Sequence, residues 1–208
     1  MKFVTLSLRS LLFRQLKHLD RTSISRQREG LEVINSQAKN LTAFLDSYHR
    51  LTHLPEPEYK TVSVPALFTK LERLLQAEPR SERVVYCDGK ADKSTGKELQ
   101  VYGDANLLTL ALINLIRNAL QAVEGQEDGI VRVDTCAGAT GHLLITITDN
   151  GPGIPPERLS AIFTPFFSTK SGGSGIGLPI SQRIMQLHGG QLSVSSIPNV
   201  RTEFRMEF

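Results

Sequence analysis

The sequence lacks most features that would tie it to a membrane, a disulfide framework or a nucleic acid. Its two cysteines, Cys87 and Cys136, lie far apart in segments typical of strands, so we expect buried or idle thiols. No stretch approaches the roughly 18 apolar residues that a membrane span needs, and Arg9 interrupts the N-terminal apolar run too early for a signal peptide. The 24 basic residues are dispersed among 21 acidic ones, which leaves no basic patch. We therefore expect a cytoplasmic chain that makes no contact of its own with a membrane or with nucleic acid.

Proline and glycine are almost absent from the first quarter of the chain. No proline precedes Pro55, and Gly30 is the only glycine before it, a composition that permits long helices. The polar stretch LDRTSISRQREG separates two apolar stripes and predicts two antiparallel helices joined near residues 20–25. These stripes favour a dimeric four-helix bundle, with packing against the chain's own domain as the alternative. The two stripes, with spacings of three and four, are Leu8, Leu12, Leu16, Leu19 and Leu31, Ile34, Ala38, Leu41, Leu45, Tyr48.

Two prolines, Pro55 and Pro57, end the second helix and predict a domain boundary. We expect a hairpin over residues 1–54, a linker over 55–59 and a second domain over 60–208. The polar loop DGKADKSTGKE is expected to form the tip of a hairpin, and Ala91 and Glu98 stand where a Walker-type phosphate loop needs Gly and Ser or Thr. The expected strands cover 59–63, 83–87, 99–102, 130–135, 142–148, 191–196 and 202–208, and the helices 65–75, 105–123 and 178–187.

The helix predicted over residues 105–123 is apolar on nearly every side, as in a buried helix. Asp104 is placed to cap its start. Within it, Asn114, Asn118 and Gln121 form a polar stripe at spacings of four and three. Because each unsatisfied buried polar group costs roughly 1–3 kcal/mol, the stripe must face a ligand, backbone carbonyls or water.

The stretch from Asp149 to Leu178 combines an acid with two glycine clusters. Asp149 follows a predicted strand and can accept a hydrogen bond from an exocyclic amine, while Gly151 and Gly153 allow a tight turn. Gly173, Gly175 and Gly177 leave backbone N–H groups open before a helix, as at phosphate sites. Together they indicate a nucleotide pocket, with structural turns as the alternative for each cluster. We expect His188, beside a Gly pair, to end a helix and not to act in catalysis.

Three signals now stand in one order: NLIRNA, then DNGPGI, then PFFSTK followed by GSGIGL. This arrangement resembles the ATP-binding catalytic domain of sensor histidine kinases, in the superfamily of gyrase, heat-shock chaperones and MutL. The resemblance covers about residues 60–208, and the helix ending in YHRLTHLPEPEY resembles the second helix of the kinases' dimerisation and phosphotransfer hairpin. It implies an α+β chain, in which a helical hairpin, paired as a dimeric four-helix bundle, precedes a two-layer α/β sandwich ATP-binding domain.

The resemblance also implies roles for individual residues. Asn118 and Asn114 would coordinate Mg²⁺ on the ATP phosphates, Asp149 would accept from the adenine amine, and Asn114 and Lys170 would be catalytic. ATP-hydrolysing members carry Glu where this chain has Asn114, and an amide cannot take a proton, so phosphotransfer is favoured over hydrolysis by a gyrase-like clamp. The remaining residues implied in ATP binding are the turn glycines Gly151 and Gly153, the lid anchors Phe166 and Phe167, Thr169 near the phosphates, and Gly173, Gly175, Gly177 and Leu178 of the phosphate-facing loop.

The chain departs from the family at the phospho-accepting histidine. None of His18, His49 and His53 is followed by the acid of the usual box, so we expect the sequence to start just after that box. The phosphate would then be transferred to a His-bearing partner kinase chain, and a response regulator would act downstream. We expect a homodimer, and the full-length kinase can be anchored to a membrane through a region outside this chain. The alternative is a non-catalytic nucleotide-binding dimerisation or regulatory module. In SIPNVRTEF, the residues at 199–201 replace two family glycines, and we expect an altered loop.

Overall fold

The computed structural model describes residues 28, 31–38, 42, 45, 48–49, 53–87, 98–137, 142–168 and 173–208. The chain divides into two compact units, Met1–His49 and Arg50–Phe208, which are considered separately. In the first unit, residues 31–38 are helical, as predicted for the second hairpin helix, and Leu31, Ile34, Leu45 and Tyr48 are exposed. The predicted first helix and the joint near 20–25 lie outside the described residues.

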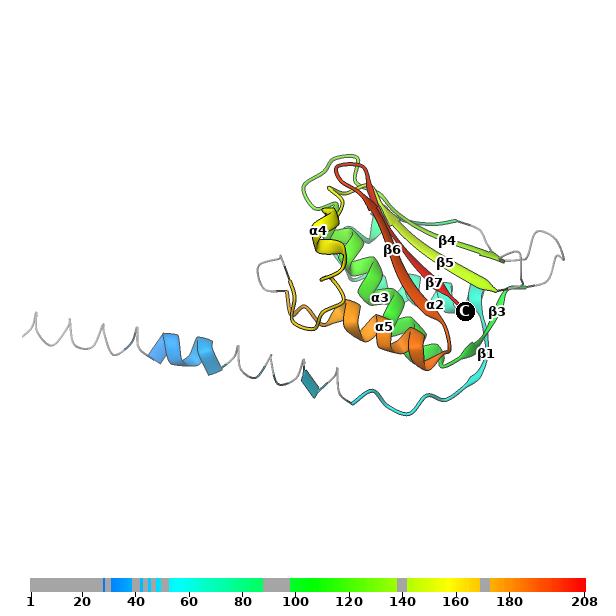
Figure 1. Cartoon of the computed structure of the whole chain (residues 1–208), viewed down its shortest axis with the longest axis horizontal. Helices are drawn as coiled ribbons and strands as arrows, with labels where there is room; N and C mark the ends of the chain where they lie inside the picture. The colour runs from blue at the N-terminus through cyan, green and yellow to red at the C-terminus, as the bar shows by residue number, and fades with distance from the viewer. Residues whose placement is uncertain are drawn as a thin grey trace, which may run out of the picture. The chain divides into compact units, whose positions relative to one another are not determined.

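The second unit is built on a five-stranded sheet with the order β2-β4-β5-β7-β6. Its strands are β2 (Val84–Tyr86), β4 (Val131–Ala137), β5 (Leu143–Asp149), β7 (Arg201–Glu207) and β6 (Gln191–Ile197). Strand β2 runs parallel to β4, and the other neighbours are antiparallel. The helices α2 (Val64–Leu75), α3 (Ala105–Ala122) and α5 (Gly177–Leu187) cover one face, so the unit has two layers (Figure 1). The expected α/β sandwich is confirmed.

The predicted hairpin between the strands near residues 83–87 and 99–102 was wrong. Strand β3 (Gln100–Gly103) pairs instead with β1 (Lys60–Ser63) in a separate two-stranded sheet, while β2 pairs with β4. In this pairing Val101 is buried and lies opposite Val62. The polar loop that precedes β3 in the sequence carries no information about which distant strand pairs with it. The sequence also gave no sign of the short helices η1 (Ser81–Arg83) and α4 (Pro156–Leu159).

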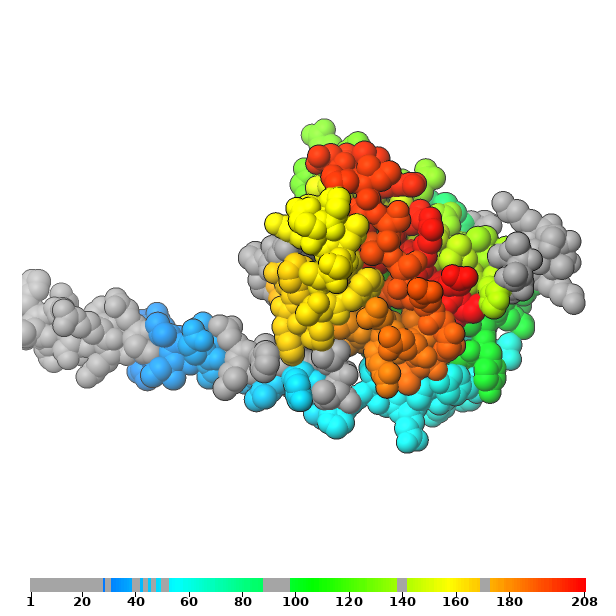
Figure 2. Space-filling view, viewed as in Figure 1, coloured from blue at the N-terminus to red at the C-terminus, as the bar shows by residue number. Residues whose placement is uncertain are grey.

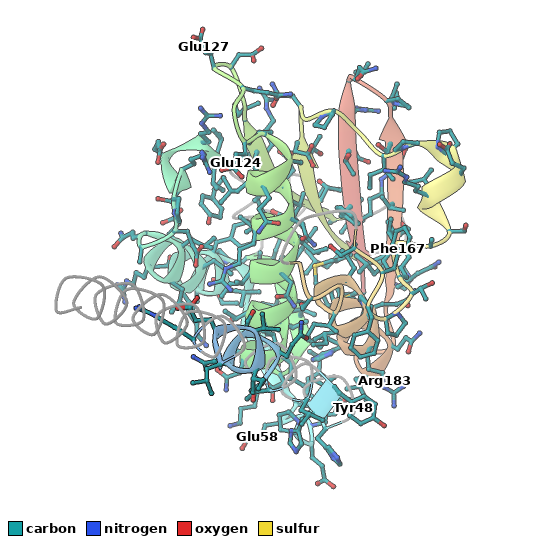
Figure 3. The ribbon with its side chains drawn as sticks, turned by 90° about the vertical axis from the view of Figure 1, so that its left-hand side faces the viewer. Tyr48, Glu58, Glu124, Glu127, Phe167 and Arg183 are labelled. Atoms are coloured by element: carbon teal, nitrogen blue, oxygen red, sulfur yellow. The ribbon has the colours of Figure 1, made fainter. Side chains whose placement is uncertain are left out.

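Helix α3 runs through the middle of the helical layer, and its apolar side chains form much of the core (Figure 3). Leu108, Leu112 and Leu115 are fully buried, as the apolar composition predicted. The predicted cap is confirmed, because Asp104 Oδ1 accepts hydrogen bonds from the N–H groups of Asn106 at 2.7 Å and Leu107 at 3.0 Å. Within the described ranges, no helix is long and apolar enough to cross a membrane.

The N-terminal end of α3 is tied to the segment that enters the domain. Asp104 Oδ2 accepts from the backbone N–H of Glu58 at 2.8 Å, and Figure 3 shows Glu58 at the end of α3 opposite Glu124 and Glu127. His188 ends α5, as predicted; its Nε2 accepts from the N–H of Asp104 at 2.9 Å, and its Nδ1 donates to the carbonyl of Ile184 at 2.7 Å. Burial would raise the pKa of Asp104, but the N–H groups of Glu58, Leu107 and Asn106, together with nearby His188, lower it below its ordinary value.

Candidate nucleotide-binding site

Asp149 is the last residue of β5, and its side chain is turned toward the helical layer. Along β5, alternate residues from Leu143 to Asp149 are buried, so the acid occupies the inward position after Ile147 and is only 2% exposed. Its Oδ1 accepts a hydrogen bond from the N–H of Gly151 at 3.0 Å. A buried carboxylate at a strand end offers a fixed acceptor to a ligand that carries a donor.

The turn after Asp149 depends on its two glycines for different reasons. A Cβ built on Gly151 would lie 2.7 Å from Asp149 Oδ1 and 3.0 Å from the Cβ of Ala122, so any side chain would fill the space beside the acid. Gly153 has φ +72°, a conformation that glycine adopts without strain. The Asn150 side chain accepts from Ile130 N–H at 2.7 Å and donates to the Asp128 carbonyl at 2.9 Å. The turn is therefore set by the fold.

The tip of the β6–β7 hairpin packs against this turn. The N–H of Asn199 donates to the carbonyl of Pro152 at 2.7 Å, and the N–H of Ile154 donates to Ser196 Oγ at 2.7 Å. Between them, a Cβ on Gly153 would lie 2.6 Å from the carbonyl oxygen of Ile197. In the space-filling view, the yellow surface that includes this turn adjoins the orange-red hairpin tip (Figure 2).

The tip of the β6–β7 hairpin contains one residue in the left-handed conformation. Asn199 has φ +58°, and the N–H of Val200 donates to the carbonyl of Ile197 at 3.0 Å. Proline at the second position and a positive φ at the third are the pattern of a type II turn. Asparagine tolerates this conformation better than most residues, so it fits the third position of the turn.

Thr202 completes the buried polar side of the site, and our residue-level predictions missed it. It lies directly opposite Asp149 in the β5–β7 register and is 3% exposed. Directly opposed residues place their side chains on the same face of the sheet. The available signal was the alternation of Thr202 with the buried apolar residues Phe204 and Met206, which marks a hydroxyl at an inward position.

The Asn-bearing helix and the glycine-rich segment come together where α5 begins. Asn114 Nδ2 donates to the carbonyl of Gly177, the first residue of α5, at 3.4 Å. A Cβ added to Gly177 would make only ordinary van der Waals contacts with Asn114. Ser181 Oγ also faces α3, at 3.4 Å from the carbonyl of Ala111. Asn114, the first residue of the polar stripe, therefore faces the N-terminal turn of α5, and the start of a helix favours anions.

The segment between Phe166 and Gly175 is closed at its base by backbone contacts. The N–H of Phe166 donates to the carbonyl of Gly175 at 3.0 Å, and the two residues have φ +66° and +65°. A Cβ on Gly175 would lie 2.6 Å from the Phe166 carbonyl carbon. We call this pair of residues, Phe166 and Gly175, the neck of the segment. A side chain at Gly175 would collide with the backbone of Phe166.

The predicted site residues divide by where the structure places them. Phe166 is 40% exposed, whereas Phe167 and Leu178 pack partly against the core, with Phe167 beside α5 in Figure 3. Gly173 is exposed. Thr169 and Lys170 lie outside the described residues. Within the described ranges, no three His, Cys, Asp or Glu side chains group as a metal site.

Comparison with known proteins places this geometry in a family. The family described as "Histidine kinase-, DNA gyrase B-, and HSP90-like ATPase" matches residues 103–208, and the chain belongs to it. The matching region is a catalytic domain of the histidine kinase type.

Two curated relatives extend the similarity toward the N-terminus. The sensor histidine kinase ZraS of Salmonella typhimurium is 32% identical over 171 residues, which are 81% of this chain and 35% of ZraS. The sensory histidine kinase/phosphatase NtrB of Vibrio alginolyticus is 34% identical over 184 residues, 84% of this chain and 50% of NtrB. The chain thus spans between a third and a half of these relatives.

Solved structures give the same fold. The catalytic domain of the histidine kinase ThkA superposes with a TM-score of 0.59 at 27% identity, over 73% of this chain and 95% of that domain. ThkA in complex with the response regulator TrrA superposes with a TM-score of 0.64 at 22% identity, over 85% of this chain and 49% of that chain. The second likeness supports the fold alone.

Proposed function

We propose that this chain is the ATP-binding core of a two-component sensor histidine kinase, and that it transfers the γ-phosphate of ATP to a histidine of a partner chain. The observation that supports the proposal is the juxtaposition of two buried polar residues, Asp149 and Thr202, with a turn in which a side chain at Gly151 would collide with Asp149. Asp149 would accept from the adenine amine, above the turn shaped by Gly151 and Gly153.

The residues present fit Mg²⁺ as well as ATP. Mg²⁺ prefers oxygen ligands and is commonly held by one or two protein groups together with substrate phosphates. Asn114 and Asn118 would supply amide oxygens from α3, beside the start of α5. When bound, the metal would neutralise negative charge on the phosphates. The phosphates would lie along Gly173, Gly175 and Gly177, with Leu178, Thr169 and Lys170 near them and Phe166 and Phe167 at the lid's base.

In this reaction the chain's own residues position ATP and stabilise charge. A neutral imidazole nitrogen of the acceptor forms a bond to the γ-phosphorus as the bond from that phosphorus to the β–γ bridging oxygen breaks, ADP leaves, and the proton on the other ring nitrogen passes to water. Lys170 would balance the charge that develops. Asn114 has no basic group with which to activate water, which favours transfer over hydrolysis.

The first unit would dimerise through its helical hairpin, and we propose the domain limits 1–54, 55–59 and 60–208. The exposure of Leu31, Ile34, Leu45 and Tyr48 along one helical stripe supports a partner helix. A homodimer is the simplest source of that helix. A response regulator would take the phosphate from the acceptor histidine.

The decisive experiment mixes this chain with a related kinase chain that keeps its acceptor histidine but cannot bind ATP. With γ-labelled ATP and Mg²⁺, we expect acid-labile, alkali-stable label on the partner and none on this chain. Absence of label on the partner, together with ATP binding by this chain, would favour the second candidate, a non-catalytic nucleotide-binding regulator. Sustained ATP turnover by this chain alone would instead favour a gyrase-like clamp.

A further inference from the structure

Ser196, near the end of β6, joins the turn after Asp149 to Thr202. Its Oγ accepts from the N–H of Ile154 at 2.7 Å, donates to the carbonyl of Arg201 at 3.0 Å and lies 3.2 Å from Thr202 Oγ1. One hydroxyl therefore contacts both the glycine turn and the residue opposite Asp149.

The direction of these hydrogen bonds follows from counting protons. A serine hydroxyl has one proton and two lone pairs, and a carbonyl oxygen can only accept. Because the Ser196 proton goes to the carbonyl of Arg201, the hydroxyl of Thr202 must be the donor in the Ser196–Thr202 pair. The lone pairs of Thr202 Oγ1 are then what that hydroxyl presents on its other side.

We infer that Ser196 determines which base the site accepts, by holding Thr202 as a hydrogen-bond acceptor beside the acceptor Asp149. Two acceptors on one face match a ligand group with two N–H donors, such as the amino group at position 6 of adenine. They oppose a carbonyl oxygen at the same position, as in hypoxanthine or guanine, because two facing acceptors leave both unsatisfied. This inference rests on the proposed function, since it assumes that the base of a nucleotide occupies this end of the site.

Ser196 is thus a specificity-determining residue that acts through Thr202. In Ser196→Ala, the Thr202 hydroxyl loses its acceptor and can turn to donate to a carbonyl oxygen of the ligand. The change should therefore raise the affinity for the carbonyl-bearing base while the affinity for adenine stays near its wild-type value. A serine that only stabilised the turn would lower both affinities together.

The test is calorimetric titration of the full chain with ATP and with ITP in Mg²⁺. We expect the wild-type chain to prefer ATP, and Ser196→Ala to reduce that preference about three- to tenfold, mainly through tighter ITP binding. Ser196→Thr, which keeps the hydroxyl, should retain the wild-type preference. Ser195→Ala is the matched control, because Ser195 is the exposed neighbour on the same strand.

A double variant tests whether the effect of Ser196→Ala on ITP binding depends on Thr202. In Thr202→Val the hydroxyl is absent, so adding Ser196→Ala should no longer improve ITP binding. An unchanged ATP-to-ITP ratio in Ser196→Ala, or an ITP gain that persists with Thr202→Val, would overturn the inference while leaving ATP binding intact. If the wild-type chain binds neither nucleotide, the proposed function fails, and the inference fails with it.

Discussion

The two ends of the candidate site are built differently. At the base end, Asp149 and Thr202 are buried, and hydrogen bonds from Asn199 and Ile154 hold the glycine turn against the β6–β7 hairpin. At the phosphate end, Phe166 and Gly173 are exposed, and the neck includes a backbone hydrogen bond between Phe166 and Gly175, two residues with positive φ. On the proposed function, the fold itself would set base recognition, whereas the phosphate contacts would be completed when the nucleotide binds.

The largest expected effect is at the base end. Asp149→Asn removes a buried carboxylate but keeps its shape and one acceptor oxygen. Because a hydrogen bond to a charged group contributes about 1.5–3 kcal/mol, ATP affinity should fall roughly 10- to 100-fold. Calorimetry measures the loss, and thermal unfolding checks the fold. Wild-type affinity in this variant would show that the preformed end does not bind the base.

The next effect separates the two ends. Gly175→Ala places a Cβ 2.6 Å from the Phe166 carbonyl carbon and should distort the neck. We expect affinity for ATP to fall about tenfold while affinity for adenosine stays near the wild-type value. Gly189→Ala is the matched control, because Gly189 has a similar φ, +69°, and no atom within 4 Å of the added Cβ. Equal losses for adenosine and ATP would contradict the division into two ends.

A smaller effect concerns the metal. Asn118→Ala removes an amide one turn along α3 from Asn114, the residue that contacts the start of α5. We expect about a fivefold loss of ATP affinity with Mg²⁺ and little change when the metal is chelated, because only a metal ligand gives a metal-dependent loss. Gln121→Ala, at an exposed position one turn along the helix, serves as the control. Equal losses with and without Mg²⁺ would mean that Asn118 acts on the fold or on the nucleotide directly.

The smallest effect lies away from both ends, at the cap of α3. The pKa of Asp104 is lowered in the folded chain, so its contribution to stability is present above the unfolded pKa of about 3.9 and is lost as the pH falls toward the folded value. Asp104→Asn should cost about 1 kcal/mol of unfolding free energy near neutral pH, and less as the pH drops from about 5 to 3.

Urea unfolding of the wild-type chain and of Asp104→Asn, from neutral pH down to about pH 3, measures the difference in unfolding free energy. The ATP affinity of the variant at neutral pH should equal that of the wild type. A difference in stability that grows as the pH falls would have the wrong sign for a lowered pKa.

The sequence predicted the local parts of this architecture well. Periodicity located α3 and α5, the position of Asp104 predicted the α3 cap, and the glycines after Asp149 marked a turn that the structure bears out. These features depend on residues close together in the chain.

The sequence patterns could not predict which strands and turns that lie far apart in the chain would contact one another. The contact from Ile154 to Ser196 spans 42 residues, and the pairing of Asp149 with Thr202 depends on a strand register that alternation does not specify. For the same reason, β2 was assigned to a hairpin with β3, although it pairs with β4. The turn after Asp149 could therefore be predicted from its acid and glycines, but the hairpin that holds the turn could not.

Amide hydrogen exchange, with and without a non-hydrolysable ATP analogue and Mg²⁺, tests the contrast between the two ends most directly. In the free chain, the N–H groups of Gly151, Ile154 and Asn199 should already be protected and should change little on binding. The N–H groups of Gly173, Gly175 and Gly177 should gain protection only with the nucleotide. Exchange at the base end that is fast in the free chain and slow in the complex would contradict the account, because the fold would then not have set that end in advance.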